Sequence, residues 1–162
     1  MKGKKILVLA LIAMMTVSIP LAFANGVPHD YMSKLWAGRN HEEVGLVLVD
    51  WEDEDTLRIT YETIEGCYLV ETHLAVVDDP NDFPMTKSGN PKIGHFPYAN
   101  YHDPPVTEFT YYVDVEGEGE FYIAAHAVVC CGCKCETAWG QGNYVEFPGN
   151  SWALYFIFDV PP

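Results

Sequence analysis

The sequence predicts an all-β protein, an antiparallel two-sheet β-sandwich of the immunoglobulin-like or jelly-roll-like kind with two long loops. The chain is rich in Tyr, Phe, Trp, Val, Ile and Thr, the residue types that favour strands. Gly, Pro, Asn and Asp recur at short intervals, as they do in turns between short strands. In addition, no stretch of about 11 residues or more shows a helical period of apolar residues.

Six segments have the composition and spacing of strands, and turn residues separate several of them, as in "WEDED", "IEG" and "EGEGE". A further segment, 30–38 ("DYMSKLWAG"), predicts one short helix or an irregular lead-in. Six short strands at this spacing are typical of a two-sheet antiparallel architecture. The six predicted strands lie near residues 44–50, 56–63, 67–77, 107–115, 120–130 and 152–160.

Two long connections interrupt the predicted strands. The first covers residues 78–106 and contains six prolines, and the second covers residues 130–151. Long loops in compact domains are usually functional or disordered. Because the first loop carries the aromatic residues Phe83 and Phe96, we expect it to pack down on the sandwich.

The start of the chain predicts export. A basic "MKGKK" precedes an apolar run over residues 6–19, and Ala22 and Ala24 form an Ala-x-Ala cleavage signal. The run is shorter than the roughly 20 apolar residues that a membrane-spanning helix needs. We therefore expect a signal peptide over residues 1–24, a single domain over residues 25–162, and no membrane span in the mature chain.

The chain is strongly acidic. It has 9 Lys and Arg against 23 Asp and Glu, and its formal net charge is −14. Three of the lysines belong to the predicted signal peptide, so the mature chain is more acidic still. Such a surface repels nucleic acid and anionic lipid, and it favours cations. No nucleic-acid partner is expected.

Five segments, in the order "VETHLAVV", "GNPKIGHFPY", "FYIAAHAVV", "ETAWGQG" and "SWALYF", carry a resemblance to a known family. The chain from about Val44 to Phe158 resembles an uncharacterised β-sandwich domain found in exported and cell-surface proteins of archaea and bacteria. The resemblance implies an extracellular domain, often part of a larger surface protein. It implies no activity and no catalytic residue, and it places "CCGCKC" where that domain has a variable loop.

Four of the five cysteines lie within six residues, at Cys130, Cys131, Cys133 and Cys135, and the fifth is Cys67. Because exported thiols oxidise, one interpretation is a disulfide staple in which Cys67 pairs with Cys130 or Cys131. Two loop cysteines would then pair locally and one thiol would be left over. A second interpretation is a thiolate site for Zn²⁺ or Cu(I). The third is a redox centre that uses the Cys-x-x-Cys spacing of Cys130 and Cys133.

A possible imidazole and carboxylate site follows from strand alternation. Glu71 and His73 share one face of the strand 67–77, and His126 is in phase with Cys130 on the strand 120–130. If the two strands are neighbours, Glu71, His73 and His126 converge beneath the long loops. They suit Zn²⁺ or another transition ion. The alternative is a buried polar network that fixes the loops.

Acidic turns offer a calcium site, although none follows the pattern of a helix–loop–helix calcium loop. The best candidate is "DDPND", which opens the first long loop with the oxygen donors of Asp78, Asp79, Asn81 and Asp82. The alternative is a solvated acidic turn.

Aromatic residues in and near the long loops suggest a saccharide platform, because the apolar faces of sugar rings pack on aromatic planes. The candidates are Tyr98, Tyr101, Trp139 and Tyr144, with Trp152 as a further member. The alternative is that these side chains fill the core under the loops.

The sequence favours a secreted, non-catalytic domain for extracellular binding or cell-surface association, with a cation or a glycan as its ligand. A metal-binding protein that uses the cysteines between Cys130 and Cys135 is the first alternative. A small secreted enzyme is the second. It has little support, because the serines after residue 24 are Ser33, Ser88 and Ser151, and none lies in Gly-x-Ser-x-Gly.

Overall fold

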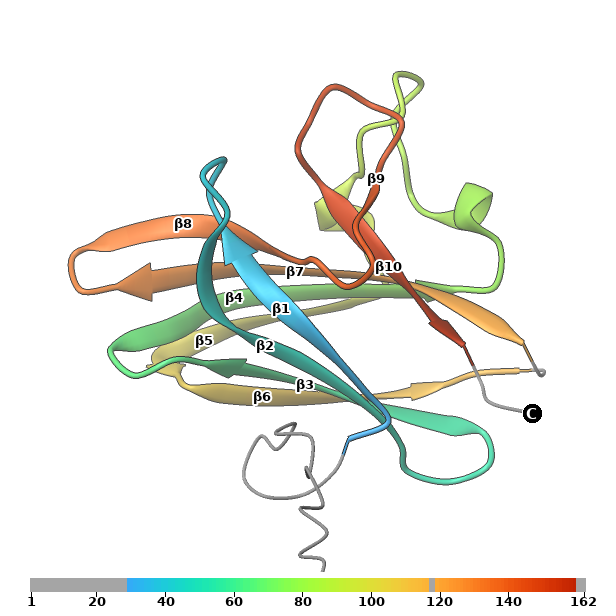
Figure 1. The fold of residues 1–162 in the computed structure, drawn as a ribbon, viewed down its shortest axis with the longest axis horizontal. Helices are drawn as coiled ribbons and strands as arrows, with labels where there is room; N and C mark the ends of the chain where they lie inside the picture. The colour runs from blue at the N-terminus through green and yellow to red at the C-terminus, as the bar shows by residue number, and fades with distance from the viewer. Residues whose placement is uncertain (1–28, 117–118, 160–162) are drawn as a thin grey trace, which may run out of the picture.

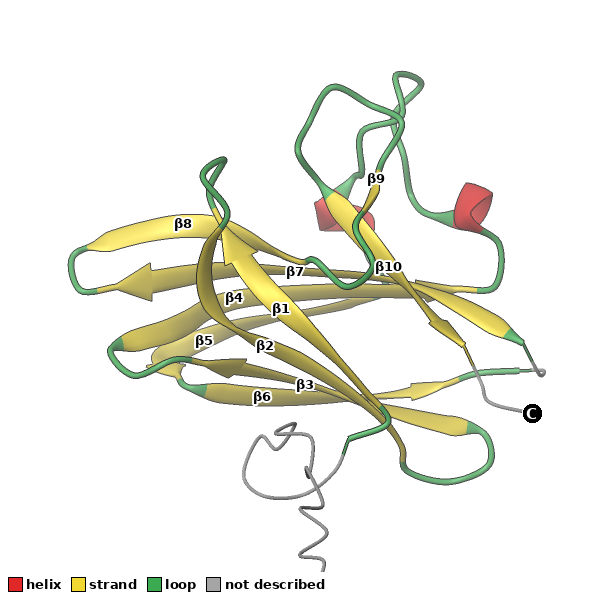
Figure 2. Cartoon of the chain, in the orientation of Figure 1, coloured by secondary structure: helices red, strands yellow, loops and turns green. Residues whose placement is uncertain are grey.

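A computed structural model describes residues 29–116 and 119–159. The described chain is all-β and antiparallel, which confirms that part of the prediction (Figure 2). Its helical residues belong to two short 3-10 turns, Pro80–Asp82 and Ile93–His95. Within this part of the chain, no helix is long and apolar enough to cross a membrane. The predicted signal peptide, residues 1–24, lies outside the described residues.

The described residues form ten strands, whose arrangement Figure 1 shows. All six predicted strands are present, and two of them, β3 and β4, have the predicted bounds. The strands are β1 Tyr31–Ala37, β2 Glu42–Trp51, β3 Thr56–Thr63, β4 Cys67–Val77, β5 Tyr98–Val106, β6 Glu108–Asp114, β7 Glu120–Cys131, β8 Lys134–Gly140, β9 Val145–Glu146 and β10 Leu154–Asp159.

The strands form one continuous hydrogen-bonded path in the order β5-β4-β7-β8-β1-β2-β3-β6, with β10 paired to β7 and β9 paired to β10. The path curls until its two ends meet through side chains. The Tyr111 hydroxyl on β6 lies 2.8 Å from the Thr72 hydroxyl on β4. The Tyr98 ring on β5 lies 5.8 Å from the Tyr111 ring. The result is a nearly closed, barrel-like sheet, and the predicted arrangement as two separate sheets is not confirmed.

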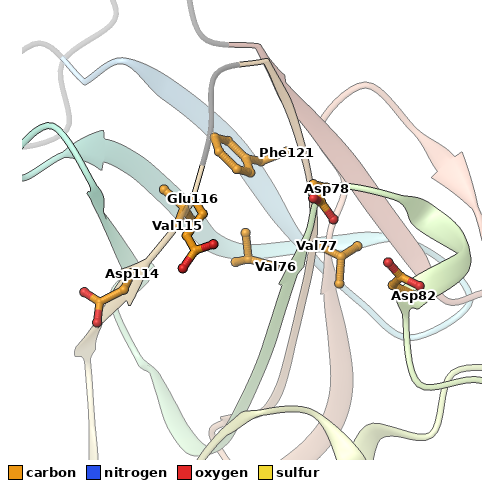
Figure 3. Close-up of a pocket in the computed structure, with 8 residues that line it drawn as sticks. All are labelled: Val76, Val77, Asp78, Asp82, Asp114, Val115, Glu116 and Phe121. Atoms are coloured by element: carbon orange, nitrogen blue, oxygen red, sulfur yellow. The ribbon is translucent and has the colours of Figure 1, made fainter.

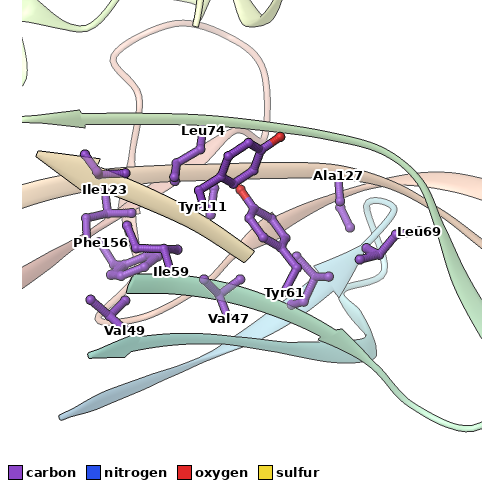
Figure 4. Close-up of a cluster of buried hydrophobic side chains, with 14 of the residues drawn as sticks. Val47, Val49, Ile59, Tyr61, Leu69, Leu74, Tyr111, Ile123, Ala127 and Phe156 are labelled. Atoms are coloured by element: carbon purple, nitrogen blue, oxygen red, sulfur yellow. The ribbon is translucent and has the colours of Figure 1, made fainter. Parts of the chain in front are cut away.

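The main core fills the inside of this curled sheet (Figure 4). Side chains alternate along each strand, so every second residue of β2, β3 and β7 points inward. Tyr61 is fully buried there and donates a hydrogen bond from its hydroxyl to the carbonyl oxygen of His73, at 2.9 Å. The inward-facing residues include Val47, Val49, Ile59, Leu69, Leu74, Ile123, Ala127 and Phe156.

A second apolar cluster covers the outer face of β4, β7 and β8. Phe83 and Phe96 of the first long connection are buried in it, which confirms that this connection packs on the sheet. The two long connections also bind each other, because the amide of Gly149 donates to the carbonyl of Gly89 at 3.1 Å. The members of this outer cluster are Ala75, Phe83, Phe96, Ala124, Trp139, Phe147, Ala153 and Leu154.

The two predicted loops are shorter than expected because each contains a strand. β5 occupies the end of the first, and it tolerates Pro104 and Pro105 since it is the last strand of the path, where one row of amides needs no partner. β8 and the short β9 lie in the second. The sequence does not single out β8, because the strand begins with Lys, Cys and Glu and has glycines near both ends, a composition that resembles a turn.

The prediction of a short helix or irregular lead-in over 30–38 is wrong, since this segment forms β1. Its residues Met32, Leu35 and Ala37 favour helices by intrinsic propensity. β1 lies between β2 and β8 and exchanges backbone hydrogen bonds with them. Tertiary pairing therefore overrides the local preference.

Candidate functional site

A row of aromatic and imidazole rings crosses the outer face of the sheet. The strand register places His73 of β4 opposite His126 of β7, His126 opposite Trp139 of β8, and Trp139 opposite Trp36 of β1. The ring centroids are 5.6 Å apart for His73 and His126 and 4.8 Å apart for His126 and Trp139. We call these four residues the ring row. One end is buried beneath the loops, and the other end, at Trp36, is half-buried.

Beyond Trp36, the ring row continues into a surface cluster that the sequence analysis missed. The His41 ring stacks on the Trp36 ring, with centroids 4.8 Å apart and an interplanar angle of 12°. Trp152 lies 5.8 Å from His41, and Tyr144 lies 6.1 Å from Trp36. We call Trp36, His41, Tyr144 and Trp152 the aromatic groove. Tyr144 and Trp152 are residues that the sequence analysis names, whereas Trp36 lies in the segment 30–38, whose strand was not recognised, and His41 lies in the turn that follows it.

The backbone of the aromatic groove is unusual. His41 and Tyr144 both have positive φ angles, of 56° and 59°, in the left-handed region that side chains other than glycine rarely adopt. Such conformations cost free energy and occur often at ligand sites. Tyr144 is 44% exposed and donates a hydrogen bond from its hydroxyl to Glu146, which raises the pKa of Tyr144. The turns therefore hold two rings at the surface in fixed positions.

A polar hollow of about 390 Å³ adjoins the aromatic groove, and Trp152 forms part of its wall. Its charged groups have both signs. Lys134 and Glu136 pair at 2.9 Å, and this contact raises the pKa of Lys134. The hollow thus offers many hydrogen-bond donors and acceptors beside an apolar plane. Its polar lining consists of Arg39, Asn40, Glu42, Lys134, Glu136 and Thr137.

At the buried end of the ring row, Glu71, His73 and His126 share one face of the sheet, as predicted. β4 and β7 are neighbours, and Nε2 of His73 is hydrogen-bonded to Oε1 of Glu71. Strict alternation along β4 also predicts Cys67 and Leu69 on this face, and that prediction is wrong. A β-bulge between Leu69 and Glu71 inserts Val70 and reverses the alternation, so Cys67 and Leu69 point into the core, opposite to Glu71 and His73.

His126 is the least satisfied polar side chain of this region. It is only 3% exposed, and neither of its ring nitrogens has a hydrogen-bond partner in the part of the chain that the structure describes. Burial, with a smaller contribution from His73, lowers the pKa of His126 to about 3. The imidazole is therefore neutral at physiological pH, with one nitrogen able to donate and the other able to accept.

The predicted metal site at Glu71, His73 and His126 is not assembled. Over residues 29–116 and 119–159, no group of three or more His, Cys, Asp or Glu side chains is arranged to hold a metal ion. The carboxylate of Glu71 is already used by Nε2 of His73. The contacts match the alternative interpretation for Glu71 and His73, a buried polar pair, but they leave Nδ1 of His73 and both nitrogens of His126 without partners.

The cysteines form two cross-strand pairs at the ends of β4, β7 and β8. Cys67 pairs with Cys131 and Cys130 pairs with Cys135, at disulfide distance in both cases. Of the two pairings open to Cys67, the structure selects Cys131, because these two residues are directly opposite in the strand register. Cys133 is the remaining free cysteine, and it is exposed at the tip of the hairpin between β7 and β8.

These pairings leave no thiolate cluster for Zn²⁺ or Cu(I). A sulfur in a disulfide carries no negative charge, so Cys130, Cys131 and Cys135 cannot act as thiolate ligands while they are bridged. The predicted Cys-x-x-Cys redox pair is not formed either, since Cys130 pairs with Cys135 and not with Cys133. Instead, Cys67–Cys131 ties the end of β7 to the start of β4, and Cys130–Cys135 joins β7 to β8 within their hairpin.

The residues predicted to bind calcium lie in two different environments. Asp79 caps the 3-10 turn and accepts hydrogen bonds from the backbone and side-chain nitrogens of Asn81, at 2.8 and 2.7 Å. Asp78 and Asp82 instead border a cavity of about 280 Å³ (Figure 3). Its other acidic members, Asp114 and Glu116, come from the far end of β6 and the residues after it. Although the cavity is acidic, these carboxylates do not meet as a cation site among the described residues.

The predicted saccharide platform of Tyr98, Tyr101, Trp139 and Tyr144 does not exist as one surface. Trp139 is buried in the outer cluster, and Tyr98 packs on Tyr111. Tyr101, 73% exposed, stands beside His73 on the edge strand β5. Tyr144 alone joins the aromatic groove. Core filling, the alternative interpretation, therefore describes Trp139 and Tyr98.

In the comparison with known proteins, no family model, no curated protein and no solved structure matches the chain. The aromatic groove, the polar hollow and the ring row are therefore interpreted from their own geometry.

Proposed function

We propose that the chain is an exported, non-catalytic domain that binds a saccharide in the aromatic groove and the adjoining hollow. Export is supported by the basic and apolar start of the chain and its Ala-x-Ala signal. It is also supported by four cysteines in disulfide pairs, since such bridges persist in oxidising compartments. The resemblance to a domain of cell-surface proteins points in the same direction.

The observation that carries the proposal is the position of Trp152, which packs against His41 in the groove and also belongs to the wall of the polar hollow. Sugar rings have an apolar face that packs on aromatic planes and a rim of hydroxyl groups that needs hydrogen-bond partners. The groove supplies the planes. Arg39, Asn40 and Glu42 supply donors and acceptors within the same hollow.

A saccharide suits the hollow better than a cation does. The positive groups Arg39 and Lys134 balance the negative groups Glu42 and Glu136 there, and Lys134 and Glu136 form an ion pair, so no excess negative charge is left to hold a cation. Hydroxyl groups, by contrast, pair with both signs of charge. Because the ligand is neutral, the strongly acidic surface of the chain does not repel it.

The test is a glycan array probed with the purified protein, followed by affinity measurements on the glycans that bind. We expect Trp152→Ala to weaken binding about fivefold or more, since a lost aromatic contact is worth about 1 kcal/mol or more. Tyr112→Ala is the matched control, because Tyr112 is an exposed aromatic residue on β6, away from the groove. An array without binding, or equal losses in the two variants, would contradict the proposal.

A further inference from the structure

A second, smaller cavity lies beside the polar hollow and opens the ring row to a ligand. Its volume is about 210 Å³, and it shares Thr137 and Trp152 with the hollow. Most of its wall is apolar and comes from Trp139 and Ala153 of the outer cluster and from Ile93, which packs against that cluster. A ligand that rests on Trp152 therefore has an apolar recess next to it.

His126 lines this cavity, together with the polar residues Asn90, Thr137 and Ser151. Its imidazole is nine-tenths buried or more, and both of its nitrogens are without partners among the described residues. An unsatisfied buried polar group is rare and costly, so it requires an explanation. Because His126 lines the cavity, a ligand group placed there lies beside an imidazole that no hydrogen bond of the described chain holds.

The chemistry of the cavity restricts what can fill it. A neutral imidazole has one donor and one acceptor, and it has no charge with which to attract an ion. A charged group would lose its hydration in an apolar recess of this kind without a counter-charge. The complementary ligand group is small, neutral and partly apolar, and carries its own donor and acceptor. An acetamido group has these properties, since its methyl suits Trp139 and Ile93 and its amide suits His126.

We propose that this cavity receives the acetamido group of an N-acetylated hexosamine whose ring stacks in the aromatic groove. The inference rests on the proposed saccharide function and names the class of sugar. Trp152 separates the two compartments, so one face contacts the sugar ring while the neighbouring recess takes the substituent. His126 then gains the hydrogen bond that the described chain does not provide.

The experiment compares the methyl glycosides of N-acetylglucosamine and glucose, which differ only at the second carbon. We expect the N-acetyl sugar to bind at least tenfold more tightly to the unmodified protein, because its amide satisfies a buried group that glucose leaves unpaired. We expect His126→Phe to reduce this preference to less than threefold. His95→Phe, at an exposed histidine outside the cavity, should retain the tenfold preference.

A second measurement uses the unmodified protein, so it does not depend on whether a variant folds. The imidazole nitrogen resonances of His126 in the unmodified protein should shift when the N-acetyl sugar is added and stay unchanged with glucose. Equal affinity for both sugars, or resonances that do not respond to the N-acetyl sugar, would overturn the inference while leaving the saccharide function intact. Failure of both sugars together with binding of other array glycans would also overturn only the inference. A blank array would remove the proposed function as well.

Discussion

His126 is a single buried side chain whose environment changes its protonation. It lies between His73 and Trp139 in the ring row, almost fully buried and without a hydrogen-bond partner in the described chain. Folding transfers it from water, where a histidine has a pKa near 6.5, to a site where its pKa is about 3. The folded protein therefore excludes a proton that the unfolded chain binds readily in mild acid.

This exclusion predicts an acid-dependent loss of stability. A base whose pKa is lowered by folding does not change the free energy of unfolding above about pH 6.5. The loss of stability that it causes grows as the pH falls from about 6.5 toward 3. The free energy of unfolding should then fall by about 1.4 kcal/mol per pH unit through this group alone. His73, hydrogen-bonded to Glu71, is the titratable group that faces it.

Urea unfolding between pH 7 and pH 4 measures this slope. The variant His126→Phe keeps a ring against Trp139 but cannot bind a proton. Its free energy of unfolding should fall less steeply as the pH is lowered, with a slope smaller by the contribution of about one proton. His95→Gln removes an exposed histidine and should leave the slope unchanged. Parallel slopes for the unmodified protein and His126→Phe would show that His126 is not held neutral.

At the scale of elements, one disulfide pair holds the hairpin of β7 and β8 to β4, and the other joins β7 to β8 within the hairpin. One pair, Cys67–Cys131, joins residues 64 positions apart, while the other, Cys130–Cys135, joins residues 5 positions apart. A crosslink restricts the unfolded chain more when it closes a longer loop. The two bridges should therefore contribute different amounts to the free energy of unfolding, although they lie side by side.

Removal of each pair tests this difference. In a Cys133→Ser background, which prevents thiol exchange, replacing Cys67 and Cys131 by Ala should lower the free energy of unfolding by about 4 kcal/mol. The same change at Cys130 and Cys135 should lower it by about 2 kcal/mol. Guanidinium unfolding of the oxidised proteins gives both values. A larger loss from the short-range pair would contradict the chain-entropy explanation.

The whole molecule depends on how its sheet closes. The end strands β5 and β6 meet through side chains, with Thr72 at the centre. The Thr72 hydroxyl lies 2.8 Å from the Tyr111 hydroxyl and 3.1 Å from Nε2 of His102, and all three residues are buried. Burial raises the pKa of Tyr111 and lowers that of His102, so both rings are neutral in the closed sheet.

Tyr111→Phe should therefore destabilise the whole fold. The change removes the hydroxyl that bonds both the side chain and the carbonyl of Thr72, and it leaves buried groups less satisfied, at a cost of about 1–3 kcal/mol. Tyr112→Phe is the matched control, since the neighbouring ring is exposed and should change stability by less than about 0.5 kcal/mol. Thermal unfolding followed by circular dichroism measures both. Equal melting of the two variants would show that Tyr111 does not contribute to closure.

Much of the fold was predictable because strand alternation and turn residues are local properties. The bounds of β3 and β4 were predicted correctly, as was the packing of Phe83 and Phe96 against the sheet. The convergence of Glu71, His73 and His126 followed from alternation once their strands were neighbours. The bulge at Val70 was not predictable, since an inserted residue shows only against a paired strand.

The sequence alone determined the all-β class, the acidic charge and the limited set of cysteine pairings. These depend on composition and on the period of two along a strand. Only the tertiary structure decided which strands meet, and hence that Cys67 pairs with Cys131 and that Trp36, His41, Tyr144 and Trp152 form one groove. The rings of that groove come from β1, from the turn between β1 and β2 and from the second long connection. Their proximity results from the pairing of strands distant in sequence, which no local pattern records.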